Sequence, residues 1–482
     1  MSKYVDRVLA ELKEKNANEP EFLQTAEEVL TSLGPVVDAH PEYEKAALLE
    51  RMVEPERTVE FRVVWVDDNG QTHVNRGYRV QFNGAIGPYK GGLRFHPSVN
   101  LSIMKFLGFE QTFKNSLTTL PMGGAKGGSD FDPRGKSDAE VMRFCQAFMT
   151  ELQRHIGPDV DIPAGDLGVG AREIGYLYGQ YRRIRGAFEN GTITGKGLSF
   201  GGSLIRPEAT GFGAVYYLEA VLKHENDTLA GKTVSLAGFG NVAWGAATKL
   251  AELGAKAVTL SGPDGYIYDP DGITTKEKLD YMLEMRASGR DRVQDYADKF
   301  GCKFVPNDKP WGEKVDIVMP CATQNDVNME QAKRIVANNI KYYIEVANMP
   351  TTNDALKFLM EQENMVVAPS KAVNAGGVLV SGLEMSQNSE RYSWTAEEVD
   401  SKLHQIMTGI HDNSAAAAER YGLGYNLVAG ANIGDDKVDT AVVADCFQHS
   451  ACQQGDDDKF AHTGDTRSHS AEPIEESGGR QN

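Results

Sequence analysis

The chain has 482 residues, of which 41% are apolar and 24% charged, and its formal net charge is −18. This length exceeds one ordinary domain, so two hydrophobic cores are expected. The acidic balance argues against nucleic acid or an anionic membrane surface as a partner. Because no signal peptide, no apolar run of about 18 residues and no C-x-x-C pair occurs, we expect a cytoplasmic protein with reduced thiols and no membrane partner.

The chain begins with predicted helices and a hairpin. Apolar residues at helical spacing over 1–60 predict amphipathic helices that cover a core or a neighbouring subunit. Residues 61–66 and 72–82 then have the composition of two strands, and the Asp68-Asn69-Gly70 turn between them predicts a β-hairpin. Helices are expected over 101–119 and 137–155, the second with a Ser-x-x-Glu capping box.

Three glycine-rich segments of the first half carry Lys90, Lys126 and Asp166, and we predict that they are loops in which a ligand can approach the backbone closely. Gln111 and Lys114, three residues apart on the predicted helix, share a face. Taken singly, such a lysine is more often a solvated charge, and such an aspartate a turn former. If the lysines converge, mutual repulsion and partial burial lower their pKa values toward the range of an acid or base.

The second half contains a dinucleotide-binding fingerprint. Residues 233–237 have the composition of a strand, 238–243 match G-x-G-x-x-A, and 242–253 have helical spacing. A second strand over 257–260 is followed by Asp264. In this strand–turn–helix context the glycines let a pyrophosphate approach, and the helix N-terminus stabilises its charge.

Three further strands are predicted over 315–319, 342–346 and 366–368, which implies a parallel sheet with helices on both faces. The loops after these strands carry polar groups, at the edge of the sheet where ligands bind. We expect Cys321 in the first of these loops to be a buried small hydrophobe rather than a catalytic group.

Seven motifs resemble those of bacterial hexameric glutamate dehydrogenases, in order and at the spacing of that family. They are PYKGG (88–92), FEQTFK (109–114), PMGGAKGG (121–128), PAGDLGVG (163–170), RPEATG (206–211), GFGNVA (238–243) and NAGGVLVSG (374–382). The resemblance runs from about residue 1 to Ile433. It implies an α/β fold with an N-terminal α/β substrate-binding and oligomerisation domain (1–200) and a Rossmann NAD-binding domain (201–425). A segment that returns to the first domain begins at 426–433, and the active-site cleft lies between the two domains.

The resemblance also implies an activity: reversible oxidative deamination of L-glutamate to 2-oxoglutarate and ammonia, with hydride transfer to NAD. Lys126 would activate the water that attacks the imine, and Asp166 would carry protons to and from the amine. The implied substrate-binding residues are Lys90 and Ser381 for the side-chain carboxylate, Gln111 and Lys114 for the α-carboxylate, and Ala164 and Gly165 through their backbones. The implied assembly is a homohexamer, and no metal site is predicted.

The implied cofactor-binding residues are Thr210, Gly238, Phe239, Gly240, Asn241, Val242, Asp264, Asn348 and Asn374. An acid such as Asp264 after the second strand commonly hydrogen-bonds the ribose hydroxyls and repels a 2′-phosphate. No arginine lies within 261–265 to bind that phosphate, and Pro263 and Phe239 resemble the NAD-using branch of the family. We therefore expect NAD, with NADP as the alternative.

Two rival functions are a leucine, valine or phenylalanine dehydrogenase on the same scaffold and an inactive regulatory homologue. An apolar substrate would leave Lys90 and Ser381 unpaired in the pocket, which disfavours the first rival. The second would not need the intact set of Lys126, Asp166, Gln111 and Lys114.

The sequence departs from the family after Ile433. Residues 434–482 contain 11 acidic and 4 basic residues, a net charge of −7. Low hydrophobicity with high charge predicts disorder. A late change of reading frame and a genuine acidic tail that binds a partner both explain the change in composition.

Overall fold

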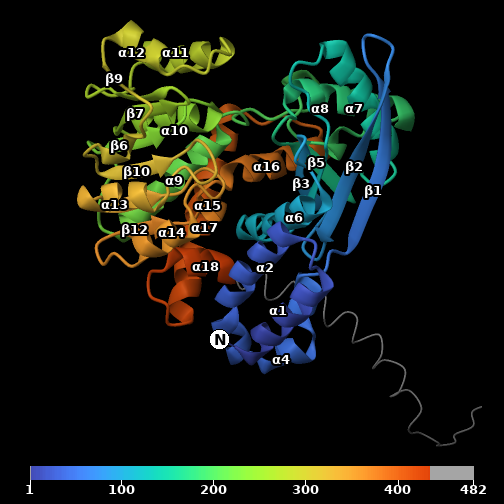
Figure 1. The fold of residues 1–482 in the computed structure, drawn as a ribbon, viewed down its shortest axis with the longest axis horizontal. Helices are drawn as coiled ribbons and strands as arrows, with labels where there is room; N and C mark the ends of the chain where they lie inside the picture. Colours follow the sequence, from blue (N-terminus) through green and yellow to red (C-terminus); the bar gives the residue numbers. More distant parts are fainter. Residues whose placement is uncertain (1, 435–482) are drawn as a thin grey trace, which may run out of the picture.

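The computed structural model describes residues 2–434 as two α/β units that lie side by side (Figure 1). Met1 and residues 435–482, which include the predicted acidic tail, lie outside the described residues. Each unit has one β-sheet with helices on both faces. None of the helices within 2–434 has the length and apolar content needed to cross a bilayer.

The N-terminal segment is helical, as predicted. Its helices are α1 (Lys3–Lys15), α2 (Pro20–Ser32), α3 (Gly34–Ala39), α4 (Pro41–Lys45) and α5 (Leu48–Met52). Their apolar residues join one hydrophobic cluster with Tyr78, Val80 and Phe82 of the first sheet. These helices therefore cover part of one face of that sheet.

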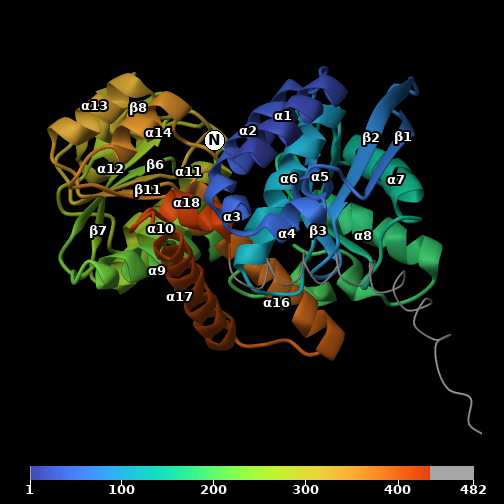
Figure 2. The same cartoon turned by 90° about the horizontal axis from the view of Figure 1, so that it is seen from below.

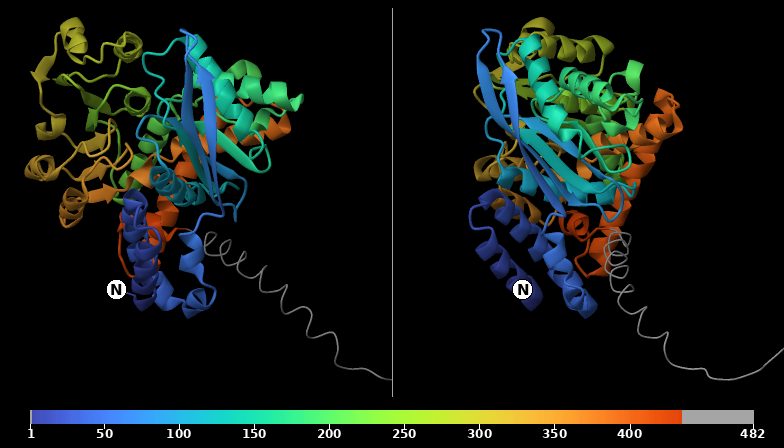
Figure 3. Two further views of the ribbon diagram at one scale, coloured as in Figure 1. Left: turned by 45° about the vertical axis from the view of Figure 1, so that its right-hand side comes forward. Right: turned by 90° about the vertical axis from the view of Figure 1, so that its right-hand side faces the viewer.

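The first sheet has the order β1-β2-β4-β3-β5. Its strands are β1 (Arg57–Val66), β2 (Thr72–Asn83), β3 (Tyr89–Phe95), β4 (Gly124–Ser129) and β5 (Asp161–Gly165). The predicted hairpin is confirmed: β1 and β2 pair antiparallel and form an outer edge of the molecule (Figure 3). Helix α6 (Leu101–Leu117) packs on the face with the N-terminal helices, and α7 (Asp138–Leu152) and α8 (Ala171–Arg185) cover the other face. The predicted capping box of Ser137 and Glu140 is present.

The loop prediction for Lys90 and Lys126 is wrong, because both residues lie in strands. Lys90 is in β3 and Lys126 in β4, and these strands pair in parallel at the centre of the sheet. Glycine is uncommon within strands because it is flexible and has no side chain to pack. In β3 and β4, however, the neighbouring backbones leave no room for a side chain. A Cβ at Gly91 would collide with the carbonyl of Ala125, and one at Gly128 with the backbone of Arg94.

The glycines also make room for a buried ion pair. Arg79 extends from β2 across β4 and β3, where it donates to the carbonyl of Gly91 over 2.9 Å. It reaches Asp161 on β5, and its Nε donates to Asp161 Oδ2 over 2.9 Å. Both side chains are 0% exposed. A Cβ at Gly127 would lie 3.0 Å from the Arg79 Cδ, so a larger residue there would crowd the arginine.

The second sheet has the order β12-β11-β10-β6-β7-β8-β9. Its strands are β6 (Thr233–Ala237), β7 (Lys256–Gly262), β8 (Gly265–Tyr268), β9 (Lys303–Pro306), β10 (Ile317–Pro320), β11 (Tyr342–Ile344) and β12 (Val366–Ala368). The predicted parallel core is present, but the sheet is mixed. β7–β8 and β8–β9 pair antiparallel, and a tight turn at Pro263 and Asp264 joins β7 to β8. β8 and β9 are not among the strands predicted from the sequence.

Helices cover both faces of the second sheet. They are α9 (Ala209–His224), α10 (Asn241–Glu252), α11 (Lys276–Ala287), α12 (Gln294–Phe300), α13 (Met329–Ala337), α14 (Asn353–Met360), α15 (Ser370–Val373), α16 (Gly376–Glu390), α17 (Ala396–Arg420) and α18 (Leu427–Ile433). Short 3-10 turns lie at Asn190–Thr192, Leu198–Phe200 and Pro310–Gly312.

Two C-terminal helices connect the units. Helix α16 points into the space beside β3 and β5 of the first unit (Figure 1). There Lys196, from the segment before α9, is paired with Glu384 of α16 over 2.7 Å, and both side chains are fully buried. Helix α18 lies against α2 (Figure 2), and Ile433 joins the hydrophobic cluster of the N-terminal helices.

Candidate active site

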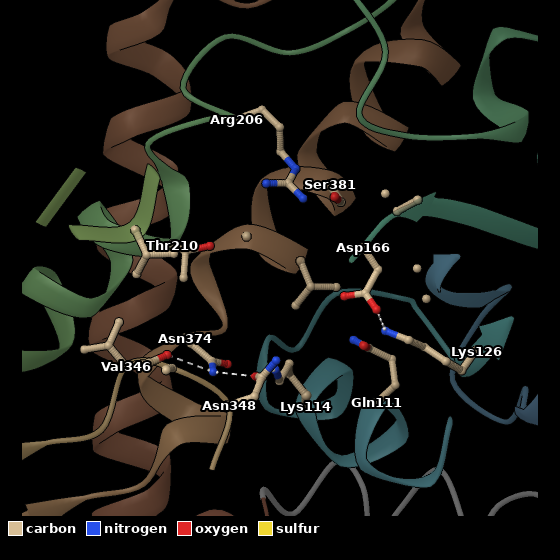
Figure 4. A pocket seen from close by; sticks show the side chains of 18 of the residues that line it. Gln111, Lys114, Lys126, Asp166, Arg206, Thr210, Val346, Asn348, Asn374 and Ser381 are labelled. Carbon is tan, nitrogen blue, oxygen red and sulfur yellow. Dashed lines mark hydrogen bonds and ion pairs between the residues drawn. The ribbon is translucent and has the colours of Figure 1, made fainter. Parts of the chain in front are cut away.

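A cavity of about 310 Å³ lies between the two units. Its walls combine β3, β4, β5 and α6 of the first unit with α9, α16 and the ends of β10 and β11 of the second (Figure 4). Twelve of the predicted site residues line it: Lys90, Gln111, Lys114, Lys126, Ala164, Gly165, Asp166, Thr210, Val242, Asn348, Asn374 and Ser381. The fold thus brings together residues that are up to about 290 positions apart in the chain.

Lys126 and Asp166 form an ion pair at this cavity. The Lys126 Nζ lies 3.0 Å from Asp166 Oδ2, and the Nε of Arg94 donates to the same oxygen over 2.9 Å. Burial opposes ionisation of Asp166, but the charges and hydrogen bonds of Lys126 and Arg94 outweigh it and lower its pKa to about 2. Asp166 is therefore a carboxylate at neutral pH.

The lysines of the cavity have lowered pKa values, mainly because they are buried. Burial lowers the pKa of Lys126, although Asp166 opposes this effect. Burial also lowers the pKa of Lys114 to about 8, with a contribution from the charge of Lys126, and that of Lys90 to about 7, with contributions from Arg79 and Arg206. The sequence predicts that mutual repulsion of the lysines is the main cause of lowered pKa values and that partial burial adds to it. In the structure burial dominates, and for Lys90 the repelling charges are arginines.

One part of the cavity holds Lys114 with three amide side chains. The Lys114 Nζ donates to Asn348 Oδ1 over 3.3 Å, and Asn374 Nδ2 donates to the same oxygen over 2.8 Å. Gln111 Nε2 donates to Asn115 Oδ1 over 2.7 Å, which orients the Gln111 amide on the same helical face as Lys114. Lys114 and Gln111 can thus present N–H groups to one carboxylate.

Another part of the cavity holds Lys90, Ser381 and Arg206. The Lys90 Nζ donates to Thr194 Oγ1 over 2.8 Å and has no carboxylate within ion-pair distance among the described residues. Arg206 points toward Ser381, well away from Lys114, in Figure 4. Its Nε is buried without a hydrogen-bond partner within residues 2–434. A buried, unpartnered cationic group costs free energy unless a ligand pairs with it, so this region is suited to an anion.

Arg206 is the functional candidate that the sequence analysis missed. It is the first residue of the RPEATG motif, and the resemblance predicts no role for it. The sequence does carry a signal, because Arg206 is a charged residue four positions before Thr210 and shortly after the glycine-rich residues 195–203. The other lining residues without a predicted role are Gly91, Gly92, Cys321, Ala322, Val346, Ala347, Gly377 and Val378. Cys321 is buried, as expected, and this burial raises the pKa of its thiol.

The dinucleotide fingerprint has the predicted context. Strand β6 ends at Ala237, Gly238 has φ +83°, and α10 begins at Asn241. The N-terminus of α10 has no side-chain cap, so its N–H groups remain available to a pyrophosphate. Asn374 Oδ1 is buried at the cavity without a partner within 2–434, which suits an amide donor such as a nicotinamide carboxamide. The residues present therefore fit a nicotinamide dinucleotide.

Five predicted cofactor residues do not line the cavity: Gly238, Phe239, Gly240, Asn241 and Asp264. The first four form the turn into α10, next to lining residue Val242. The Asp264 carboxylate already accepts hydrogen bonds from the backbone N–H groups of Val293 and Gln294, over 2.9 and 3.0 Å, at the start of α12. In this structure Asp264 therefore stabilises a helix terminus, and its contact with ribose stays a prediction.

Two family models match the chain. The model of Glutamate/Leucine/Phenylalanine/Valine dehydrogenase matches residues 201–444, and that of the Glu/Leu/Phe/Val dehydrogenase dimerisation domain matches residues 55–183. The first match extends eleven residues past Ile433, where the sequence analysis placed the departure from the family.

Curated and solved relatives agree with the family models. The NAD-specific glutamate dehydrogenase of Clostridium symbiosum is 82% identical over 445 residues, which are 92% of this chain and 99% of the relative. A solved glutamate dehydrogenase is 80% identical with a TM-score of 0.90, covering 94% of this chain and 99% of its own. The hetero-hexameric glutamate dehydrogenase of Thermus thermophilus is 28% identical with a TM-score of 0.72, covering 86% of this chain and 96% of its own. Fold, cavity and comparisons together place this chain in the Glu/Leu/Phe/Val dehydrogenase family.

Proposed function

We propose that the protein is an NAD-dependent glutamate dehydrogenase that interconverts L-glutamate with 2-oxoglutarate and ammonia. The observation that carries this proposal is the separation of two cationic regions in one cavity. Lys114 and Gln111 lie in one region, and Arg206 and Ser381 lie in the other (Figure 4). Lys90 belongs to the region of Arg206, whose charge contributes to its lowered pKa. The Lys126–Asp166 pair lines the same cavity. A diacid pairs with both regions, whereas a monocarboxylic amino acid leaves one of them unpaired.

In the proposed mechanism each of these side chains either transfers a proton or contacts the substrate. Lys114 and Gln111 hold the α-carboxylate, and Lys90, Ser381 and Arg206 hold the distal carboxylate. The chemistry that NAD would supply when bound is that of a hydride acceptor facing the substrate Cα. Lys126, in its neutral amine form, then takes a proton from the water that attacks the imine carbon. Its lowered pKa makes this form easier to reach.

Asp166 completes the proton transfers. Its ionised carboxylate takes a proton from the substrate ammonium before hydride transfer and returns one to the departing nitrogen.

The part of the cavity proposed for the nicotinamide end of the cofactor is lined by Thr210, Val242, Asn348 and Asn374. The domain boundaries at 1–200, 201–425 and 426–433 belong to the same proposal.

A homohexamer and a cytoplasmic location complete the proposal. Support for the assembly is the dimerisation-domain model over residues 55–183 and the hexameric Thermus thermophilus relative. The Escherichia coli relative is NADP-specific at 54% identity, so the choice of NAD rests on the NAD-specific relatives and on the absence of an arginine within 261–265.

An assay at 340 nm tests the function. We expect the purified protein to reduce NAD with L-glutamate and not measurably with L-leucine, and to prefer NAD over NADP in kcat/KM. Higher kcat/KM with leucine would contradict the two cationic regions. A higher kcat/KM with NADP would overturn the cofactor assignment and leave the substrate assignment intact.

Replacing Lys90 by methionine is expected to change substrate preference. The variant keeps the length of the side chain but removes the charge proposed to pair with the distal carboxylate. We expect kcat/KM for glutamate to fall at least about 100-fold and that for norleucine, an unbranched apolar substrate, to rise. The exposed Lys136→Met variant is the control and should match the wild type. An unchanged ratio of the two substrates would exclude Lys90 from the distal site.

The pKa values of Lys90 and Lys114 predict a pH effect on binding. A lysine is charged below its pKa, so Lys90 loses its charge as the pH rises through about 7, and Lys114 as it rises through about 8. We expect the Kd of glutarate, a five-carbon diacid without the amino group, to increase about 1,000-fold from pH 6 to pH 9. Isothermal titration at intervals of half a pH unit measures this change. A Kd independent of pH would show that these lysines do not bind the diacid.

A further inference from the structure

We propose that Arg94 is a positioning residue of this reaction, which holds Asp166 so that one carboxylate oxygen is reserved for the substrate nitrogen. The proposal rests on the role assigned above to Lys126 and Asp166, and it adds a residue that neither lines the cavity nor belongs to the predicted site.

The two carboxylate oxygens of Asp166 differ in their hydrogen-bond partners. Oδ2 accepts from Arg94 Nε over 2.9 Å and lies 3.0 Å from Lys126 Nζ. Within residues 2–434, no hydrogen bond is donated to Oδ1, and the closest contacts of both Arg94 and Lys126 are to Oδ2. In Figure 4 the second oxygen of Asp166 points away from Lys126 into the cavity. Oδ1 is therefore the oxygen that can reach a substrate amine, while Oδ2 is occupied from two sides.

The position of Arg94 in the sheet makes this arrangement rigid. Strand β3 lies between β4, which carries Lys126, and β5, which leads into Asp166. Arg94 is opposite Gly128 of β4, and its neighbour Leu93 is opposite Gly165 of β5. The Phe95 N–H also donates to the carbonyl of Leu167 over 2.9 Å, so β3 holds the backbone after Asp166 as well.

Small residues keep Arg94 and Asp166 close together. A Cβ at Gly92 would lie 2.9 Å from the Asp166 Cβ, and one at Gly128 would collide with the Arg94 backbone. The Val169 N–H donates to the Asp166 carbonyl over 2.9 Å, which closes a tight turn just after the aspartate. The Asp166 side chain can therefore find its partners without a large movement of the backbone.

Arg94 also supplies a charge that Lys126 cannot supply throughout the reaction. Lys126 must be neutral before it can take a proton as a base, and in that state Asp166 has lost one of its two cationic partners. A guanidinium keeps its proton in proteins, so Arg94 keeps the carboxylate paired at that moment. Its charge contributes both to the low pKa of Asp166 and, after burial and the opposing effect of Asp166, to the lowered pKa of Lys126.

Two variants separate charge from geometry. Arg94→Met removes the charge and the hydrogen bond, and we expect kcat to fall about 100-fold with a smaller change in the KM for glutamate. Without the nearby cation the pKa of Lys126 rises, so the pH below which kcat declines should shift upward. Arg94→Lys retains the charge without the planar hydrogen-bonding geometry. We expect its kcat to lie between those of the wild type and Arg94→Met, and its pH profile to match that of the wild type.

The control is Arg134→Met, which removes an exposed arginine paired with Asp132 in the same unit and should leave kcat and its pH profile unchanged. Circular dichroism and NADH binding verify that each variant is folded. An unshifted pH profile in Arg94→Met, or an Arg94→Lys variant no better than Arg94→Met, would overturn the proposal. If Arg94→Met does not fold, Arg94→Lys decides: a lowered kcat with the wild-type pH profile supports the proposal, and an unchanged kcat overturns it. Failure of the proposed function looks different, because the wild type itself would then not oxidise glutamate.

Discussion

Replacing Lys126 by alanine is expected to give a folded protein whose kcat for glutamate is at least about 1,000-fold lower than that of the wild type. The fold should survive because Asp166 keeps Arg94 as a partner, so that no buried charge is left unpaired. Turnover should not survive, because no other amine of the cavity lies within ion-pair distance of Asp166 among the described residues.

Three measurements make this result decisive. The 340 nm assay gives kcat, thermal unfolding followed by circular dichroism tests the fold, and glutarate titration tests the binding site. Lys126→Arg is the matched variant: it keeps a positive charge beside Asp166 but cannot become neutral near pH 7. We expect it to be as inactive as Lys126→Ala. If either variant turned over at the rate of the wild type, Lys126 would not be the base.

Replacing Asp161 by asparagine should have the largest effect on stability. The Arg79–Asp161 pair is completely buried, and Gln81 Nε2 also donates to Asp161 Oδ2 over 2.9 Å. Asparagine would leave the guanidinium of Arg79 buried without a countercharge, which costs about 3–5 kcal/mol of folding free energy. We expect a marked fall in the urea midpoint of unfolding.

The matched control is Asp68→Asn. Asp68 accepts from Arg143 over 2.6 Å, but both side chains are partly exposed. Loss of such a pair typically costs less than about 1 kcal/mol, since water and salt screen it. A double variant, Arg79→Met with Asp161→Leu, should recover part of the lost stability. Equal midpoints for Asp161→Asn and Asp68→Asn would show that the buried pair contributes no more than a surface pair.

Much of the fold could be predicted because periodicity and turn chemistry act locally. The hairpin with its Asp68-Asn69-Gly70 turn, the capping box at Ser137 and the βαβ unit at β6 each depend on residues close in the chain. The strands β3 and β4 could not be found in this way. Their glycines are explained by the backbones of Ala125 and Arg94, contacts that exist only after the sheet has formed.

The site residues were predicted from sequence motifs. The prediction is incomplete for residues to which no motif assigns a role. The sequence shows that Arg206 is a charged residue close to Thr210, but nothing in its neighbours shows that its Nε is buried without a partner among the described residues. Asp264 was assigned from its position after a strand, yet its oxygens are engaged by the start of α12, which lies about 30 residues further along. The identity of a residue type at a position is visible in sequence, whereas competition for its hydrogen bonds is not.

Helix α16 has a consequence for how the substrate is chosen. It carries Ser381, and one turn later Glu384 accepts from Gly195 N–H over 3.0 Å and pairs with Lys196. The same segment of the first unit supplies Thr194, to which Lys90 donates. The region proposed to bind the distal carboxylate is thus already assembled from both units of the chain. We therefore expect the protein to discriminate between amino acids at the initial binding step. Amino acids without a distal carboxylate should dissociate rapidly from the cavity.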